Sequence, residues 1–216
     1  MIFAAGRGTR MAPLTDTVPK PLIPVNGRPL IDYALDLAQG APVILVNTHH
    51  FSDRIKAHLR DHDVIVVEEP DLLETGGGLK NALARLPVGP VITLNSDAIW
   101  LGPNVVQILE HMWDPGQMSA LLAMVPVEMA TGYRGDGDFS IDRQGRLHRG
   151  PGFVYSGAQI VDPAGLKVIN QKAFSMNVYW DQLAAKDRLF GCVYNGKWCD
   201  VGRPENIALA EELLNV

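Results

Sequence analysis

Short apolar runs alternate with helical patterns along the first half of the chain, and this alternation constrains the fold more than any other feature. Candidate strands occupy residues 2–5, 43–46, 64–67, 91–94 and 121–125. Helical patterns lie at residues 29–39, 52–59, 77–86 and 104–112. The middle strands are rich in Val and Ile without polar alternation, which is typical of strands covered on both faces. This order predicts an α/β protein with a Rossmann-like, doubly wound, mostly parallel sheet.

Length and composition set the class of protein. The 216 residues, 47% of them hydrophobic, suit one domain over 1–216. A net charge of −5 argues against a nucleic-acid partner. No apolar run approaches the ~20 residues of a membrane span, and the start lacks signal-peptide features. Cys192 and Cys199 form neither a disulfide framework nor a zinc pattern. We therefore expect a cytoplasmic protein without membrane contact, as a monomer or small homo-oligomer.

The composition changes between residues 126 and 162, where glycine becomes frequent. Residues 139–141 and 146–148 flank a turn-forming Asp-Arg-Gln-Gly segment, which predicts a β-hairpin. We expect 126–162 to form a small β-rich lobe within the single domain. In doubly wound sheets the ligand lies beyond the carboxyl ends of the strands, so this lobe would border the site from one side.

A glycine-rich loop directly follows the first strand. Gly6 and Gly8 lack Cβ atoms, so the backbone can turn sharply and bring its N–H groups close to a ligand. Such N–H groups suit phosphate oxygens, and Arg7, Arg10 and Lys20 add positive charge to an otherwise acidic protein. The loop is neither a dinucleotide fingerprint nor a P-loop, because those motifs need glycines at other positions. The simplest ligand is a polyphosphate.

Two consecutive blocks carry a family resemblance. The first reads G-R-G-T-R-M-A-P-L-T from Gly6, and the second reads K-P-L-I-P from Lys20. Together they resemble the signature of the sugar-1-phosphate nucleotidyltransferases. The resemblance implies the nucleotide-diphospho-sugar transferase fold, with Arg10 on the triphosphate tail and Lys20 on the reacting phosphates as catalytic residues. It also implies a nucleotide-binding loop made of Ala5, Gly6, Gly8 and Thr9.

Two aspartates are candidate ligands for Mg²⁺. Asp97 follows the strand at 91–94, and Asp200 stands in a W-C-D-V-G block. Both positions resemble the family's metal-binding aspartates, although Ser96 stands where glycine is usual. Mg²⁺ prefers carboxylate, phosphate and water oxygens, so this pair suits it as the cofactor.

The block E-T-G-G-G at 74–78 opens a helix after the third strand. It resembles the family's base-recognition loop, which implies nucleotide contacts from Gly76, Gly77 and Gly78. This version is similar to that of the N-acetylmuramate-1-phosphate uridylyltransferases. The same resemblance implies sugar contacts from four further residues, which are Asn47, Asp138, Ser156 and Gly157.

One family feature is missing from the sugar side. Many members carry an E-K-P block before the sugar-contacting loop, and none stands between Val125 and Gly157. Another group must therefore bind the sugar phosphate from that side, and Arg134 is a candidate.

These features predict Mg²⁺-dependent transfer of a nucleotidyl group from UTP to a sugar 1-phosphate. The preferred sugar is N-acetylmuramate 1-phosphate, which would place the enzyme in cell-wall sugar recycling. The runner-up is a mannose-1-phosphate guanylyltransferase-like enzyme. Two other classes stay open, namely a non-catalytic nucleotide-sugar sensor and a glycosyltransferase that uses Asp136 and Asp138. Retention of the cationic and acidic site residues argues against the sensor.

Overall fold

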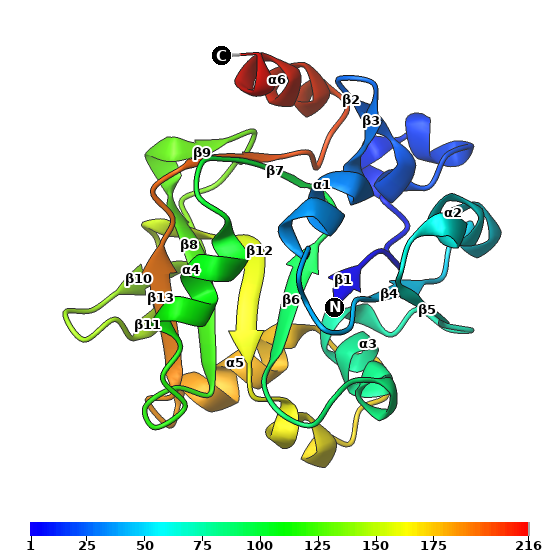
Figure 1. Cartoon of the computed structure of the whole chain (residues 1–216). Coiled ribbons are helices and arrows are strands. Elements are labelled where there is room, and N and C mark those ends of the chain that lie inside the picture. The colour runs from blue at the N-terminus through cyan, green and yellow to red at the C-terminus, as the bar shows by residue number, and fades with distance from the viewer. Residues whose placement is uncertain (216) are drawn as a thin grey trace.

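A nine-stranded sheet runs through the computed structural model, which describes residues 1–215 (Figure 1). Four strands on one side are parallel in the order β6-β1-β4-β5. Their bounds are Ile2–Phe3 for β1, Leu45–Thr48 for β4, Ile65–Glu68 for β5 and Val91–Asn95 for β6. The inner strands β4 and β6 are almost fully buried, which matches their continuous apolar runs, whereas β5 lies at the sheet edge with Ile65 exposed. The predicted parallel sheet is therefore confirmed in this half.

The other half of the sheet is mainly antiparallel. The long strand β12 (Phe153–Val161) runs antiparallel to β6 and to β8 (Ala120–Pro126), and β13 (Leu189–Val193) lies parallel to β8. The predicted hairpin is present as β10 (Phe139–Ile141) and β11 (Leu147–Arg149) at the sheet edge. The segment 126–162 is thus rich in strands, but β12 lies in the middle of the main sheet.

Helices cover both faces of the sheet, as a doubly wound protein requires (Figure 1). One core contains residues of α1 (Leu30–Leu37), α2 (Ser52–His58) and α4 (Val105–Met112). A second core contains residues of α3 (Glu74–Ala82) and α5 (Met176–Ala184). Helix α4 begins as its sequence suggests, because the Asn104 side chain accepts a hydrogen bond from the Val106 N–H.

A small second sheet closes one end of the molecule. Its order is β7-β14-β9, with bounds Ala98–Leu101, Lys197–Asp200 and Ala130–Thr131. Helix α6 (Glu205–Leu214) packs beside it, together with the short hairpin of β2 (Pro24–Val25) and β3 (Arg28–Pro29). Because β7 directly continues from β6, this sheet is positioned by the main one, and it carries the second predicted metal ligand.

Cys192 and Cys199 are free and buried, and burial raises their pKa values to about 11 and about 12. No helix within residues 1–215 is long and apolar enough to span a membrane.

Candidate active site

Three adjoining pockets form one cleft beyond the carboxyl ends of β1 and β6. Their volumes are about 200, 230 and 280 Å³. Each is below the ~300 Å³ at which ligand sites usually begin, but Asn95 lines all three and joins them. In order of increasing volume, we name them the carboxylate pocket (with Asp200), the aromatic pocket (with Trp180) and the phosphate pocket (with Gly6 and Lys20).

The phosphate pocket is built from the glycine loop. Gly8 has a φ of 64°, and a Cβ there would lie 2.9 Å from the Lys20 Cβ, so glycine is required. The Thr15 hydroxyl donates a 3.0 Å hydrogen bond to the Gly8 carbonyl and fixes the turn. A 3-10 turn, Thr9–Met11, then directs Arg10 to the wall shared by the phosphate and carboxylate pockets.

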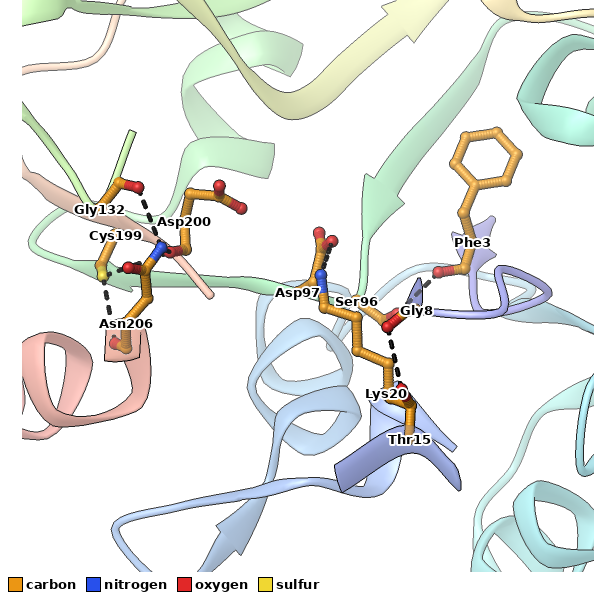
Figure 2. A network of polar contacts seen from close by, with 10 residues as sticks. All are labelled: Phe3, Gly8, Thr15, Lys20, Ser96, Asp97, Gly132, Cys199, Asp200 and Asn206. Carbon is orange, nitrogen blue, oxygen red and sulfur yellow. Dashed lines mark hydrogen bonds and ion pairs between the residues drawn. The ribbon is translucent and has the colours of Figure 1, made fainter. Parts of the chain in front are cut away.

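Lys20 and Asp97 form an ion pair inside the cleft (Figure 2). The Lys20 Nζ donates to Asp97 Oδ2 over 2.6 Å, and Lys20 is only 9% exposed. Prolines on both sides of Lys20 stiffen the segment that presents it. The Ser96 hydroxyl donates to the Phe3 carbonyl over 2.7 Å, which anchors the Asp97 loop to β1.

The second carboxylate enters from the small sheet. Antiparallel pairing of β14 with β7 sets Asp200 opposite Ala98, one residue after Asp97. The Asn206 amide donates to the carbonyls of Asp200 and Gly132 and fixes the backbone there (Figure 2). Burial, followed by the charge of Asp97, raises the pKa of Asp200 above its usual range, and nearby cations oppose this shift. Asp97 and Asp200 both line the carboxylate pocket.

This donor set fits a magnesium ion. Asp97 lies in the turn between β6 and β7, and Asp200 ends β14, so both carboxylates line one pocket, where a divalent cation would offset their negative charge. Mg²⁺ is usually held by one or two carboxylates together with phosphate oxygens. Asp97 and Asp200 are the residues that would hold it.

The aromatic pocket has a cationic edge. The Tyr155 and Trp180 rings meet edge to face at 4.7 Å, and Phe139 lies 6.1 Å from Trp180. The Arg149 guanidinium sits 4.4 Å from the centre of the Phe139 ring. Its Nε donates to Asp181 over 2.9 Å, and its Nη2 donates to Asn177 over 2.7 Å. Helix α5 thus orients a cation next to an apolar wall.

Two predicted sugar contacts border this region. The Asp138 carboxylate accepts a 2.9 Å hydrogen bond from the Tyr155 N–H, and Asp138 lines both the carboxylate and aromatic pockets. Gly157 has a φ of 90°, and a Cβ there would lie 2.9 Å from the Asn95 Cβ. Ser156 also lines the carboxylate pocket, but its hydroxyl donates to the Ala123 carbonyl inside the sheet.

Other predicted residues lie behind the cleft wall. Asn47 is 2% exposed, accepts from the Ala4 N–H and donates to Glu69, so its amide supports the loop from below. Ala5 is buried in the same loop, whereas Gly6, Gly8 and Thr9 line the phosphate pocket. The assignments of Ala5 to the nucleotide and of Asn47 to the sugar stay predictions.

The three glycines of α3 pack against protein. A Cβ on Gly76 would lie 2.4 Å from the Phe174 ring, and one on Gly77 would lie 2.4 Å from the Lys172 carbonyl. A Cβ on Gly78 would lie 2.8 Å from Glu69 Oε1. These positions need glycine for close helix packing. The base contact expected of this block stays a prediction, and Thr75 is the block's residue that lines the cleft.

Sequence reasoning missed part of the aromatic pocket. Arg149 and Trp180 come from two elements, and no contiguous motif marks them, whereas Tyr155 directly precedes the predicted Ser156 and Gly157. The available signal was Arg149, a cation directly after the predicted hairpin strand 146–148, within the region from Val125 to Gly157 that lacks the E-K-P block. Arg134, the sequence candidate, instead pairs with Glu205 over 3.0 Å at the exposed rim of the carboxylate pocket.

Known proteins are similar to this chain in sequence. A family model described as the MobA-like NTP transferase domain matches residues 1–131. The N-acetylmuramate alpha-1-phosphate uridylyltransferase of Caulobacter vibrioides is 36% identical, over 99% of this chain and 96% of that protein. Its namesake from Neisseria meningitidis is 34% identical, over 94% of this chain and 92% of that protein.

Solved structures agree on the fold. A crystal structure of UDP-glucose pyrophosphorylase complexed with UDP-glucose superimposes with a TM-score of 0.78 at 18% identity, and the match covers 99% of this chain and 97% of the other. HddC from Yersinia pseudotuberculosis superimposes with a TM-score of 0.78 at 24% identity, with the same coverage. With 36% identity over nearly the full chain and a matching NTP transferase domain, this chain belongs to the sugar-1-phosphate nucleotidyltransferases and is an enzyme of that class.

Proposed function

We propose that this enzyme transfers uridylate from UTP to N-acetylmuramate 1-phosphate in a Mg²⁺-dependent reaction. The observation that carries the proposal is the full-length similarity to two uridylyltransferases of that substrate, at 36% and 34% identity. The cleft supports it with a phosphate loop, two cations, Arg10 and Lys20, and two carboxylates, Asp97 and Asp200, which line adjoining pockets. The alternative of a glycosyltransferase that uses Asp136 and Asp138 is disfavoured by the same similarity, because both relatives are nucleotidyltransferases.

In the proposed reaction, a phosphate oxygen of the sugar 1-phosphate attacks the α-phosphorus of UTP. The new P–O bond forms as the bond to the β-phosphate breaks, which gives the UDP-sugar and pyrophosphate. The attacking phosphate is already ionised, so no general base is needed. Catalysis then depends on positioning and on neutralising charge.

The chain's cations perform that neutralisation. Arg10 and the N–H groups of the glycine loop face the pocket where the triphosphate tail would bind. Lys20 stands between this loop and the acidic pair, so its ammonium can follow the charge that develops on the transferring phosphate. Mg²⁺ held by Asp97 and Asp200 would supply further positive charge to the phosphates.

The aromatic pocket supplies a reason for a carboxylate-bearing sugar. N-acetylmuramate differs from other N-acetylhexosamines by a lactyl ether that carries a carboxylate. A guanidinium is suited to carboxylate geometry, and Arg149 is oriented by Asn177 and Asp181 beside an apolar wall. We assign Arg149 the carboxylate in place of Arg134. A cytoplasmic location and a role in cell-wall sugar recycling follow from the same substrate and stay predictions.

A substrate matrix tests the proposal. Pyrophosphate release is measured for UTP, GTP, CTP and dTTP, each with N-acetylmuramate, N-acetylglucosamine and mannose 1-phosphates. We expect the highest kcat/KM for UTP with N-acetylmuramate 1-phosphate, loss of activity with a chelator, and recovery with Mg²⁺. A preference for GTP with mannose 1-phosphate would instead assign the enzyme to the runner-up function.

A further inference from the structure

Three side chains that can ligate a metal converge between α1 and α2, outside the cleft. They are Asp32, His58 and His62, and one ligand atom from each lies within 4.8 Å of the others. His58 Nε2 and Asp32 Oδ1 are hydrogen-bonded at 2.6 Å. The two imidazole rings have centroids 5.8 Å apart. The cluster is therefore compact before any ion is considered.

The local fold holds these ligands in place. His58 is the last residue of α2, and His62 follows the 3-10 turn Leu59–Asp61, which gives the H-x3-H spacing common in zinc sites. Asp32 lies in the first turn of α1. The buried faces of both helices pack in one core, so the distance between Asp32 and the histidines is set by packing.

The surrounding charges admit a cation. The Arg28 guanidinium lies beside the cluster, where it donates to the Asp32 backbone carbonyl over 3.0 Å and is paired with Asp36 over 2.6 Å. The adjoining pocket is lined by Arg28 together with three aspartates, Asp32, Asp36 and Asp63, and by His62, so carboxylates outnumber the cation there. Further oxygen ligands, from carboxylate or water, can therefore complete the coordination of an ion bound there.

We propose that Asp32, His58 and His62 bind a divalent transition-metal ion of the Zn²⁺ type, at a site separate from the catalytic cleft. Two imidazoles with one carboxylate suit Zn²⁺, Co²⁺ or Ni²⁺, whereas Mg²⁺ prefers oxygen ligands alone. An ion bound to His58 Nε2 would take the place of the hydrogen bond between that nitrogen and Asp32 Oδ1, with the hydrogen moving to Nδ1 of the neutral ring or to solvent from the charged ring.

The site connects to the segment that carries Lys20. The Arg54 guanidinium of α2 donates to the Thr17 carbonyl, and the Leu30 N–H at the start of α1 donates to the Ile23 carbonyl over 3.1 Å. Thr17 and Ile23 flank Lys20 in sequence. An ion that joins α1 to α2 would therefore tie together the two supports of this segment.

The test uses Zn²⁺ alone, with excess Mg²⁺ present and no nucleotide. Calorimetric titration of the wild-type protein should show Zn²⁺ binding, and the thermal midpoint should rise with the logarithm of Zn²⁺ concentration. His62→Gln and Asp32→Asn should each weaken this binding by at least the ~10- to 100-fold lost when an outer-shell partner is removed. His111→Gln, which removes an exposed histidine of α4, is the matched control and should bind as wild type does.

A second arm separates this site from the cleft. A variant with both Asp97→Asn and Asp200→Asn should keep the Zn²⁺ site, and His62→Gln should keep wild-type pyrophosphate release with Mg²⁺. Zn²⁺ affinity that is unchanged in His62→Gln, or abolished in the cleft double variant, would overturn the proposal.

Discussion

The two halves of the sheet contribute differently to one cleft. In the parallel half, β1 and β6 end at loops that carry the phosphate pocket and Asp97, and the key residues lie in short contiguous blocks. In the antiparallel half, the aromatic pocket is assembled from β10, β11, β12 and α5. The phosphate pocket is thus built largely from short sequence blocks, whereas the aromatic pocket, which we propose faces the sugar, is assembled by long-range packing.

The largest effect is expected from removing the carboxylate of Asp200, which comes from β14 and not from the parallel half of the sheet. Asp200→Asn should lower kcat/KM by about a thousandfold, the upper range for losing one electrostatic contact to the transition state. Asp97→Asn should do the same, because both carboxylates are needed against one cation. Steady-state pyrophosphate release over a Mg²⁺ titration checks this. Asp53→Asn, on the exposed face of α2, is the control, and an Asp200 variant with wild-type metal dependence would remove Asp200 as a ligand.

The next effect concerns the parallel half alone. Lys20→Ala should lower the single-turnover rate about a hundredfold, equal to ~3 kcal/mol of transition-state stabilisation. The fold should survive, because the Asp97 carboxylate that loses its partner lies in a cleft open to water and can be hydrated. Lys56→Ala removes a lysine of α2 that pairs with Glu68 at the surface and serves as the control. Near-normal turnover of the Lys20 variant would exclude it from the mechanism.

Two glycines distinguish packing from binding within the parallel half. Gly77→Ala would place a Cβ 2.4 Å from the Lys172 carbonyl and should destabilise the fold by about 3 kcal/mol. Gly6→Ala meets no atom within 4 Å and should change stability by less than about 0.5 kcal/mol. Gly6 lines the phosphate pocket, so its variant should instead raise the KM for UTP. Urea unfolding and UTP kinetics on both variants check this, and equal stability of the two would contradict the packing role of α3.

The smallest expected effect is on stability against pH without metal. Burial and Asp97 raise the pKa of Asp200, so the folded state holds this proton more tightly than the unfolded state does. Stability from this group is present at low pH and is lost as pH rises from the unfolded value of 3.8 through the raised folded pKa. Asp200→Asn should therefore be more stable than wild type at neutral pH, with a difference that shrinks toward pH 4. Thermal midpoints in chelator give the answer, and a difference that grows on acidification would refute this sign.

The parallel half of the sheet could be predicted from the sequence more completely than the antiparallel half. The strands at 43–46, 64–67 and 91–94 appear within two residues of their expected positions, because parallel core strands have continuous apolar runs. The position of β12 in the middle of the sheet was not predicted, since its pairing with β6, from Ala158 with Leu94 to Val161 with Val91, joins segments far apart in the sequence. Arg149 was missed for the same reason: its orientation depends on Asn177 and Asp181, which no local pattern connects to it.

The most direct test of the division is a double-mutant cycle with two sugars. Rates are measured for wild type, Lys20→Ala, Arg149→Ala and the double variant, with UTP and either N-acetylmuramate or N-acetylglucosamine 1-phosphate. Lys20→Ala should lower kcat/KM by the same factor with both sugar 1-phosphates. Arg149→Ala should reduce kcat/KM for the muramate substrate alone, by at least about tenfold, as expected for one charged hydrogen bond.

The two effects should also multiply in the double variant, because Lys20 and Arg149 share no partner in the structure of residues 1–215. Arg134→Ala, which removes the cation at the exposed rim, should leave the ratio between the two sugars unchanged. The separation of chemistry from sugar choice would be contradicted by an Arg149 variant that lowers kcat/KM equally with both sugar 1-phosphates. It would also be contradicted if Lys20→Ala, and not Arg149→Ala, changed the ratio of kcat/KM between the two sugars.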